Sequence, residues 1–307
     1  MKKVDLSVIV LNYNTKKVLL DCLESIYEYT RDVSFEVVVV DNGSTDSSVD
    51  AIRDMQNERR NLRLIENKEN LGFAAGNNRA RRVVAGEYVL FLNSDTLLTE
   101  NTFKKVLGYI KNRVMKKRSE IGAMTVKQVL LNGKLDKDCR RSFPTPWVAL
   151  THFSGLDRFF PKSRLFGRYW CGYLSEDEVQ VVEALQGSFF LSPKKVLDEV
   201  GWFDEDYFLN GEDIDLSWKI KEAGYINVYY PKTRIIHIKG VTKGKKGSRT
   251  KQPLEKRIKY ALAGVDAMEL FYKKRLFKNY PRYITWLVVV GIRLMKMTRV
   301  MQEILRP

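Results

Sequence analysis

The feature that most constrains the fold is an alternation, within the first 95 residues, between short apolar runs and longer amphipathic segments. Apolar runs rich in Val, Ile and Leu occupy 6–14, 35–46, 62–67 and 87–95, and helical spacing covers 16–30 and 73–85. Unbroken apolar strands indicate burial on both faces, and strands separated by helices pair in parallel. We therefore expect an α/β fold with a mostly parallel central sheet and helices on both faces.

Polar clusters follow three of these strands, where each strand is expected to end. The clusters are Asn12-Tyr13-Asn14, Asp41-Asn42-Gly43 and Asn93-Ser94-Asp95. Ligands of open parallel sheets bind beyond the carboxyl ends of the strands, so we expect the three clusters to converge on one crevice. The sequence has no GxGxxG after the first strand and no GxxxxGK[ST], which disfavours dinucleotide and P-loop sites. With two histidines and no GxSxG, a Ser/His triad is also disfavoured.

An acidic cluster interrupts an apolar stretch at residues 208–224, "FLNGEDIDLSWKIKEAG". Glu212, Asp213 and Asp215 fall in what reads as the first turn of a helix. Acids there complement the helix dipole and cap free N–H groups, which is one interpretation. The other is that the acidic tip of a buried helix projects into a reaction site. Spacing alone leaves both open.

The second half of the chain has a different character. Asn132-Gly133 is a hairpin-turn signal, residues 178–192 read as a strand, and a short helix followed by a loop is expected within 193–208. Residues 225–231 and 233–240 read as two more strands. The three cysteines are scattered without metal-ligand spacing, which indicates a reducing compartment. The amino-terminal apolar stretch is too short for a signal peptide.

Positive charge is concentrated at the carboxyl end. Residues 239–307 hold 18 of the 53 Lys and Arg but only 4 of the 37 Asp and Glu, within a net charge of +16. Basic tails are typical of proteins that bind nucleic acid or lie on anionic lipid. The uninterrupted apolar core of the last helix, 284–292, is about half of the roughly 20 residues that span a bilayer. Its Tyr283 and Trp286 suit the headgroup level, which favours an interfacial helix; packing on the rest of the chain, or in a dimer, is the alternative.

Seven motifs in order then carry a resemblance that covers roughly residues 5–240. They are "SVIVLNYN", "VVVVDNGSTDSS", "NKENLGFAAGNN", "VLFLNSD", "LQGSFFLSPKKVLDEVGWFDEDYF", "NGEDIDLSWKIKEAGY" and "YYPKTRIIHIKG". The chain resembles family-2 glycosyltransferases of the GT-A fold, and "LNGKLDKDCRRSFPTPW" and the tail are similar to the rhamnosyltransferase-like branch. The resemblance implies a catalytic domain over 1–240, with a nucleotide-sugar half (1–95) and an acceptor half (96–240). A basic linker and amphipathic helices follow over 241–307.

On that resemblance, the strand ends bind a sugar-nucleotide donor. Asp41 accepts from a pyrimidine N3–H, Tyr13 stacks on or flanks the base, and Gly72 and Gly76 let the backbone approach the nucleotide. The other implied donor-binding residues are Leu11, Asn78, Asn93, Ser94 and Asp95. The alternatives are a turn-forming role for Asp41 and a plain helix start near Gly72.

The resemblance also implies a divalent cation, Mg²⁺ or Mn²⁺. "NSD" stands where the family often carries Asp-x-Asp, and Asn93 departs from that pattern. Asp95 is then the single charged ligand, so metal binding depends on the donor pyrophosphate. His237 is the second implied ligand; its alternative is a core histidine between isoleucines.

Asp213 matches the family's general base, which deprotonates the acceptor hydroxyl in a single inverting displacement. Glu212 is expected to orient the acceptor or to tune Asp213, and Trp202 is assigned to the same acceptor side. Asp215 cannot share the helical face of Asp213 and is expected to be structural or a helix cap.

The implied partners follow from the same resemblance. They are a dTDP- or UDP-sugar, with rhamnose favoured, and a saccharide or lipid-linked saccharide acceptor in surface-polysaccharide assembly of the cell envelope. The protein is expected to be cytoplasmic and peripheral on the inner face of the membrane through its tail; an oligomer is left open and nucleic acid is not expected. Competing interpretations are a catalytically silent sugar-nucleotide or nucleic-acid binding module and a nucleotidyltransferase. A processive synthase is disfavoured because QxxRW and a long membrane span are absent.

Overall fold

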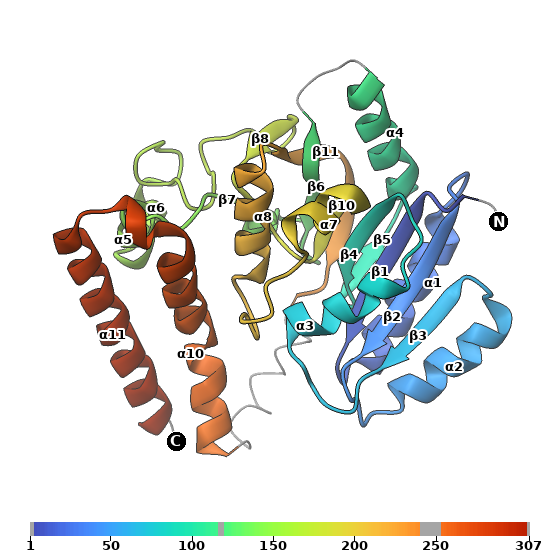
Figure 1. Ribbon diagram of the computed structural model, residues 1–307, viewed down its shortest axis with the longest axis horizontal. Helices are drawn as coiled ribbons and strands as arrows, with labels where there is room; N and C mark the ends of the chain where they lie inside the picture. Colours follow the sequence, from blue (N-terminus) through green and yellow to red (C-terminus); the bar gives the residue numbers. More distant parts are fainter. Residues whose placement is uncertain (1–2, 116–119, 240–252, 306–307) are drawn as a thin grey trace.

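The computed structural model describes residues 3–115, 120–239 and 253–305 (Figure 1). Most of the glycine- and lysine-rich linker expected after the catalytic domain, residues 240–252, lies outside the described residues.

One nine-stranded sheet organises the chain, in the order β3–β2–β1–β4–β10–β6–β11–β5, with β8 paired to β11. Its strands are β1 (Leu6–Asn12), β2 (Phe35–Asp41), β3 (Leu62–Glu66), β4 (Tyr88–Asn93), β5 (Thr96–Leu98), β6 (Ile121–Val129), β8 (Gln180–Val182), β10 (Phe189–Pro193) and β11 (Ile226–His237). The first four sequence-predicted strands form a continuous parallel block, β3–β2–β1–β4. Beyond it β10 runs antiparallel to β4, while β11 is parallel to β6.

Helices cover both faces of this sheet, as predicted. One core packs the sheet against α1 (Lys16–Tyr29), α2 (Ser48–Glu58) and α4 (Thr102–Met115). The opposite core packs it against α3 (Phe73–Asn78), η1 (Arg79–Arg82), α7 (Lys194–Val200) and α8 (Glu212–Glu222). Side chains alternate accordingly along β1: Val8 and Val10 lie in the first core and Ile9 in the second. Because both faces are buried, the strands read as unbroken apolar runs.

Three elements differ from the sequence expectation. The helix expected over 73–85 ends at Asn78 and continues only as the 3₁₀ turn η1. The strand expected over 178–192 is divided into β8, β9 (Ala184–Leu185) and β10, because β9 leaves the main sheet to pair with β7 (Arg140–Arg141). The two strands expected after α8 are one strand, β11, whose register shifts between Tyr230 and Arg234. Pro231 lies in that shift, where it has no N–H to donate to the ladder.

The C-terminal helices pack on the rest of the chain. The segment consists of α10 (Leu254–Phe271), η3 (Tyr272–Leu276), η4 (Phe277–Asn279) and α11 (Arg282–Ile304), and α10 and α11 lie side by side (Figure 1). Ala267, Phe271 and Leu276 share a third core with Phe143 and with Ile214 of α8. The packed alternative for the tail is therefore present in the structure. Among the described residues, no helix has both the length and the apolar character needed to cross a bilayer.

Candidate active site

The strand-end clusters meet at the carboxyl edge of the parallel block. Asn12 pairs with Asp41 in the β1–β2 register, and its Nδ2 donates to Asp41 Oδ2 at 2.7 Å. Thr15 Oγ1 donates to Asn12 Oδ1 at 2.6 Å and lies 3.1 Å from Ser94 Oγ. Hydrogen bonds thus connect the ends of β1, β2 and β4, which confirms the predicted convergence.

Asp41 is held firmly in place by this network. Its carboxylate accepts from Asn12 and from the backbone N–H of Ser44, at 2.8 Å, which is the turn-forming contact of the alternative interpretation. The side chain is 1% exposed, whereas Tyr13 and Leu11 beside it are half-buried. The turn contact fixes the orientation of Asp41, and its role toward a base stays a prediction.

Several implied donor-binding residues have partners within the chain. Gly72 has φ +84°, and a Cβ there would lie 2.3 Å from Phe208 O in the loop before α8. The amide of Asn78 donates to Phe203 O at 2.9 Å and to Glu205 Oε1 at 2.8 Å. These residues join α3 to the loop that leads into α8, so they position the acidic helix relative to the strand ends.

Trp202 lies in the core and is 0% exposed. Its Nε1 donates to Asp198 Oδ1 at 2.8 Å, and its ring lies 5.8 Å from that of Phe91 on β4. With no exposed surface, Trp202 does not contact an acceptor directly in this arrangement; it supports the loop before α8.

Asp95 and His237 are brought together by the pairing of β5 with the end of β11. His237 Nε2 lies 3.3 Å from Asp95 Oδ1, and Nδ1 lies 2.8 Å from Asp136 Oδ2. Asp136 in turn accepts from Lys239 Nζ at 2.7 Å. Burial lowers the pKa of His237, but the hydrogen bonds with Asp136 and Asp95 outweigh it and raise the pKa to about 9.

These residues fit a divalent cation. The ring orientation of His237 is set by Asp136 at Nδ1, which is the arrangement that metal-ligating histidines commonly have, and Nε2 faces the Asp95 carboxylate. The described residues contain no ready-made group of three or more His, Cys, Asp or Glu ligands. Two protein ligands are enough where substrate phosphates and water complete the coordination.

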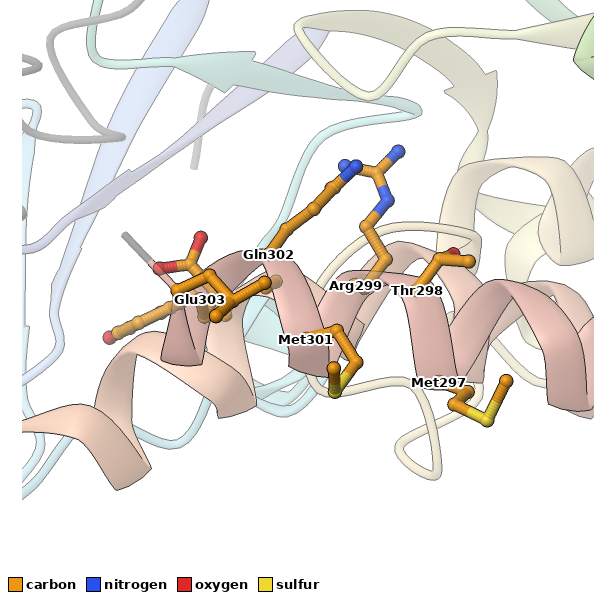
Figure 2. Close-up of a pocket in the computed structure, with 9 residues that line it drawn as sticks. Met297, Thr298, Arg299, Met301, Gln302 and Glu303 are labelled. Atoms are coloured by element: carbon orange, nitrogen blue, oxygen red, sulfur yellow. The ribbon is translucent and has the colours of Figure 1, made fainter. Parts of the chain in front are cut away.

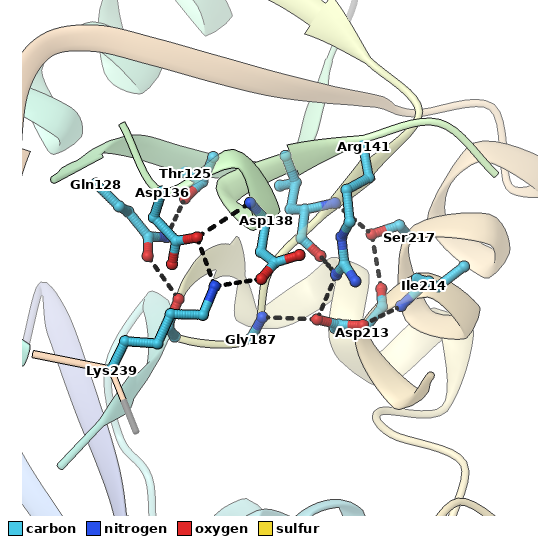
Figure 3. A network of polar contacts seen from close by, with 12 residues as sticks. Thr125, Gln128, Asp136, Asp138, Arg141, Gly187, Asp213, Ile214, Ser217 and Lys239 are labelled. Atoms are coloured by element: carbon cyan, nitrogen blue, oxygen red, sulfur yellow. Dashed lines mark hydrogen bonds and ion pairs between the residues drawn. The ribbon is translucent and has the colours of Figure 1, made fainter. Parts of the chain in front are cut away.

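Asp213, at the start of α8, is buried and ion-paired. Arg141 Nη2 donates to Asp213 Oδ2 at 2.6 Å, and the Gly187 N–H donates to the same oxygen at 3.0 Å (Figure 3). The Arg141 side chain is 10% exposed and that of Asp213 is 8% exposed. Burial lowers the pKa of Arg141, but the Asp213 carboxylate outweighs it and raises the pKa above its usual value.

The segment Gly187–Ser188 connects the two acidic centres. While Gly187 holds Asp213, Ser188 O accepts from the Asn93 N–H at 3.1 Å, two residues before Asp95. Ser188 Oγ donates to Gln128 Oε1 at 2.6 Å, and Gln128 O accepts from the Asp136 N–H. Figure 3 shows the Asp136–Lys239 and Arg141–Asp213 groups on either side of this segment.

The remaining acids of the helix have separate roles. Asp215 is fully buried and accepts two hydrogen bonds from Arg275 of η3, which confirms the structural role expected for it. Glu212 is 6% exposed, beside Asp213.

A recess of about 770 Å³ lies elsewhere, between α10 and α11 (Figure 2). Residues of these two helices and Leu305 line it, and it shares none with the strand-end clusters. It is therefore separate from the candidate active site.

Sequence reasoning missed Arg141, Asp136 and Ser188. Two signals were present: "CRRSF" places two arginines next to an apolar segment where burial demands an acidic partner, and "LQGSFF" places Gly and Ser before a core strand. Neither signal names the partner, because Arg141 and Asp213 are 72 residues apart.

Comparisons with known proteins agree with this architecture. The family model for Glycosyl transferase family 2 matches residues 7–121. Glycosyltransferase GlyG of Streptococcus pneumoniae is 30% identical over 108 residues, which cover 35% of this chain and 36% of that protein. The N-acetylglucosaminyl-diphospho-decaprenol L-rhamnosyltransferase of Mycobacterium tuberculosis is 28% identical over 226 residues, which cover 68% of each chain.

A solved structure extends the likeness over the whole chain. Mannosyltransferase PcManGT from Pyrobaculum calidifontis, in complex with GDP-Man and Mn²⁺, has a TM-score of 0.55 and 18% identity, covering 99% of this chain and 88% of that one. At that identity the likeness shows the fold alone. The matches to the first five curated relatives span between 15% and 39% of those proteins' own lengths. The chain therefore carries a glycosyl transferase family 2 domain, built on the GT-A fold of glycosyltransferases.

Proposed function

We propose that this protein is an inverting, metal-dependent glycosyltransferase that moves a sugar from a nucleoside-diphosphate donor to a saccharide or lipid-linked saccharide in surface-polysaccharide synthesis. The observation that carries the proposal is the Gly187–Ser188 segment, which holds Asp213 on one side and the Asn93–Asp95 loop on the other. The general base and the carboxylate near the diphosphate must lie on opposite sides of the reacting sugar. The backbone of Gly187–Ser188 contacts both Asp213 and the loop that carries Asp95, so it fixes the two sides relative to each other.

The donor occupies the carboxyl edge of the parallel block in this proposal. Asp41 and Tyr13 recognise the base, and the polar ends of β1 and β4 face the diphosphate. The Asn12–Thr15–Ser94 hydrogen bonds keep these groups in place before the donor arrives, so that little ordering is needed on binding. Rhamnose on a thymidine diphosphate is the proposed donor, because a relative that matches 68% of this chain is named as a rhamnosyltransferase.

Asp213 receives the proton of the acceptor hydroxyl as that oxygen attacks the anomeric carbon, and the nucleoside diphosphate leaves from the opposite face. Arg141 and the Gly187 N–H hold one carboxylate oxygen and fix its direction. Asp95 and His237 would hold a divalent cation, which when bound offsets negative charge on the leaving diphosphate.

The C-terminal helices supply the proposed membrane contact, at the cytoplasmic face. Much of the surface of α11 is apolar and exposed: Tyr283, Trp286, Leu287, Leu294, Met297, Met301 and Ile304 are each at least half exposed. Exposed apolar stripes of this kind lie in the bilayer interface or pair with another helix.

Thermal stabilisation of the purified protein by UDP, dTDP and GDP, with and without Mn²⁺, tests the donor site. A ligand that binds only the folded state raises the unfolding midpoint. We expect a Mn²⁺-dependent increase with dTDP or UDP that exceeds the increase with GDP. No increase with any of the three would overturn the enzyme proposal.

A further inference from the structure

A second apolar surface lies apart from the tail. Of the large apolar side chains that are strongly exposed in the described residues, all but Leu131 and Val181 fall within 147–165 or 254–305. The first group belongs to the segment 146–166, which contains α5 (Pro146–Phe153) and α6 (Leu156–Phe159) and which we call the aromatic segment. Its exposed members are Trp147, Leu150, Phe153, Phe159, Phe160 and Leu165.

Several large apolar side chains of α5 lie on its solvent-exposed face and not on the face that packs against the core. Val148 and Thr151 are buried, whereas Trp147, Leu150 and Phe153, spaced three apart, are 45%, 59% and 47% exposed. A surface helix ordinarily places polar residues on its open face. The exposed face of α5 is therefore built for an apolar environment.

The segment keeps a defined shape through its own contacts. Phe166 packs against Trp147 and Phe160, with ring centroids 6.2 and 5.5 Å apart, and Trp147 Nε1 donates to Leu165 O at 3.0 Å. Phe159, next to these rings, is nevertheless 79% exposed. Aromatic side chains are thus presented outward on an ordered frame.

The charges of the segment are of one sign at the surface. Arg158, Lys162 and Arg164 are exposed, and the single acid, Asp157, is 3% exposed and lies 2.6 Å from His152 Nδ1. Exposed aromatics bordered by cations, with the one acid buried, complement the headgroup region of an anionic bilayer.

We propose that the aromatic segment is a second membrane-docking surface, which inserts Phe159 and Phe160 at the interface of an anionic phospholipid bilayer. It deepens the membrane contact of the proposed function. Tyr280, two residues before α11, packs against the third core, which contains Phe143, three residues before α5. The aromatic segment therefore lies near the amino-terminal end of the exposed α11 stripe. The two surfaces together would place the acceptor half against the lipid.

Charge disfavours the other occupants. A second copy seated on this surface would bring the three cations of one chain toward those of the other. A saccharide-binding site needs exposed carboxylate or amide side chains that hydrogen-bond to the sugar hydroxyls. Residues 146–166 contain no Glu, Asn or Gln, and their one Asp is buried.

The test is sedimentation of the full-length protein with phosphatidylcholine vesicles that do or do not contain phosphatidylglycerol. Phe159→Ser with Phe160→Ser should weaken binding to anionic vesicles by about tenfold or more, since each ring loses much of its apolar burial. Arg158→Gln, Lys162→Gln and Arg164→Gln together should weaken it by about a hundredfold at low salt, at roughly fivefold per cation. Matched controls outside both surfaces are Leu131→Ser and Lys17→Gln, which should bind as the parent does.

Parent-like vesicle binding by both variants of the aromatic segment would overturn the proposal. If the double variant Trp286→Ser with Leu294→Ser then lost vesicle binding, lipid binding would be assigned to α11 alone. Absence of vesicle binding by the parent protein would also overturn the proposal. Variants that then change only the mass of the protein in solution would favour a second copy as the occupant, and variants that change only transfer to a soluble saccharide would favour the acceptor. Each variant is first checked for an unchanged thermal midpoint and an unchanged response to nucleotide. Failure of the nucleotide response in the parent concerns the proposed function and leaves the vesicle result standing on its own.

Discussion

Arg275 in the C-terminal segment makes a bidentate ion pair with Asp215 in the acidic helix α8. Nε lies 2.8 Å from Oδ1 and Nη2 lies 3.1 Å from Oδ2, and the carboxylate is fully buried. The helix that carries Asp213 is therefore fastened to the tail two residues from the proposed base. Lys274 adds contacts to Asp204 and Asp206 in the preceding loop.

Arg275→Met should destabilise the whole catalytic domain. Removing one partner leaves the Asp215 carboxylate buried without its cation, at a cost of about 3 kcal/mol, the lower end of the range because Arg275 is partly exposed. Urea unfolding measures the loss. The double variant Arg275→Met with Asp215→Leu should be more stable than the single variant, since no uncompensated charge remains; a double variant that is less stable than Arg275→Met would contradict this account.

Gly72→Ala should also destabilise the protein. The added Cβ would lie 2.3 Å from Phe208 O. The backbone of Gly72, with φ +84° and ψ −174°, is in a region that essentially only glycine adopts, which costs an L-residue about 1–3 kcal/mol before any clash. We expect a loss of at least about 2 kcal/mol in the free energy of unfolding.

Gly264→Ala, inside α10, is the matched control for Gly72→Ala. A Cβ at Gly264 meets no atom within 4 Å beyond its chain neighbours and the backbone of its own helix. Alanine in a helix interior is more favourable than glycine by about 1 kcal/mol. The same Gly→Ala substitution should therefore lower the free energy of unfolding at position 72 and raise it at position 264. Equal effects would mean that Gly72 is not constrained by Phe208.

The sequence predicted the parallel half well and the connections between distant residues poorly. The runs that became β1, β2 and β4 are apolar on both faces, and a strand buried on both faces has few other choices. Asp41 and Asn93 could be placed at strand ends for the same reason. The partners of Asp213 and Asp215, Arg141 and Arg275, could not be predicted. They are 72 and 60 residues away along the chain, and such distant pairs produce no recognisable spacing pattern in the sequence.

The broken strand at 178–192 shows a second limit. These residues read as one strand in the sequence, but the strand divides where β9 pairs with Arg140–Arg141 in a separate sheet. Which sheet a short apolar segment joins depends on tertiary packing. The same rearrangement places Arg141 and Gly187 beside Asp213, so this part of the site could not be predicted from the strand pattern.

Asp95→Asn should abolish Mn²⁺-dependent nucleotide binding. The variant keeps the size of the side chain but removes the charged oxygen that faces His237, and a hard cation depends on carboxylate ligands. Calorimetric titration of Mn²⁺ with a nucleoside diphosphate present measures the effect. His237→Gln should weaken the same binding less, since one carboxylate remains.

Asp177→Asn is the control for the metal variants, because Asp177 is 80% exposed and pairs with Lys127 outside the site. It should titrate as the parent does. Asp95→Asn with parent-like affinity for Mn²⁺ and nucleotide would remove Asp95 from the proposed metal site.

Asp213→Asn should retain donor binding and lose transfer. The amide cannot accept the acceptor proton, so kcat should fall by about a hundredfold to ten-thousandfold, the contribution of a positioned base. We propose that Arg141 acts through Asp213, so the two effects should separate in the same way. Arg141→Met should lower kcat and leave the thermal shift with dTDP or UDP unchanged, and Arg141→Lys should recover part of the rate because it restores a cation beside Oδ2. A fall in nucleotide binding that parallels the fall in kcat would instead assign Arg141 to the fold of the donor site. Transfer at the parent rate by Asp213→Asn would require a different base, and Glu212, the adjacent buried acid, would be the next residue to substitute.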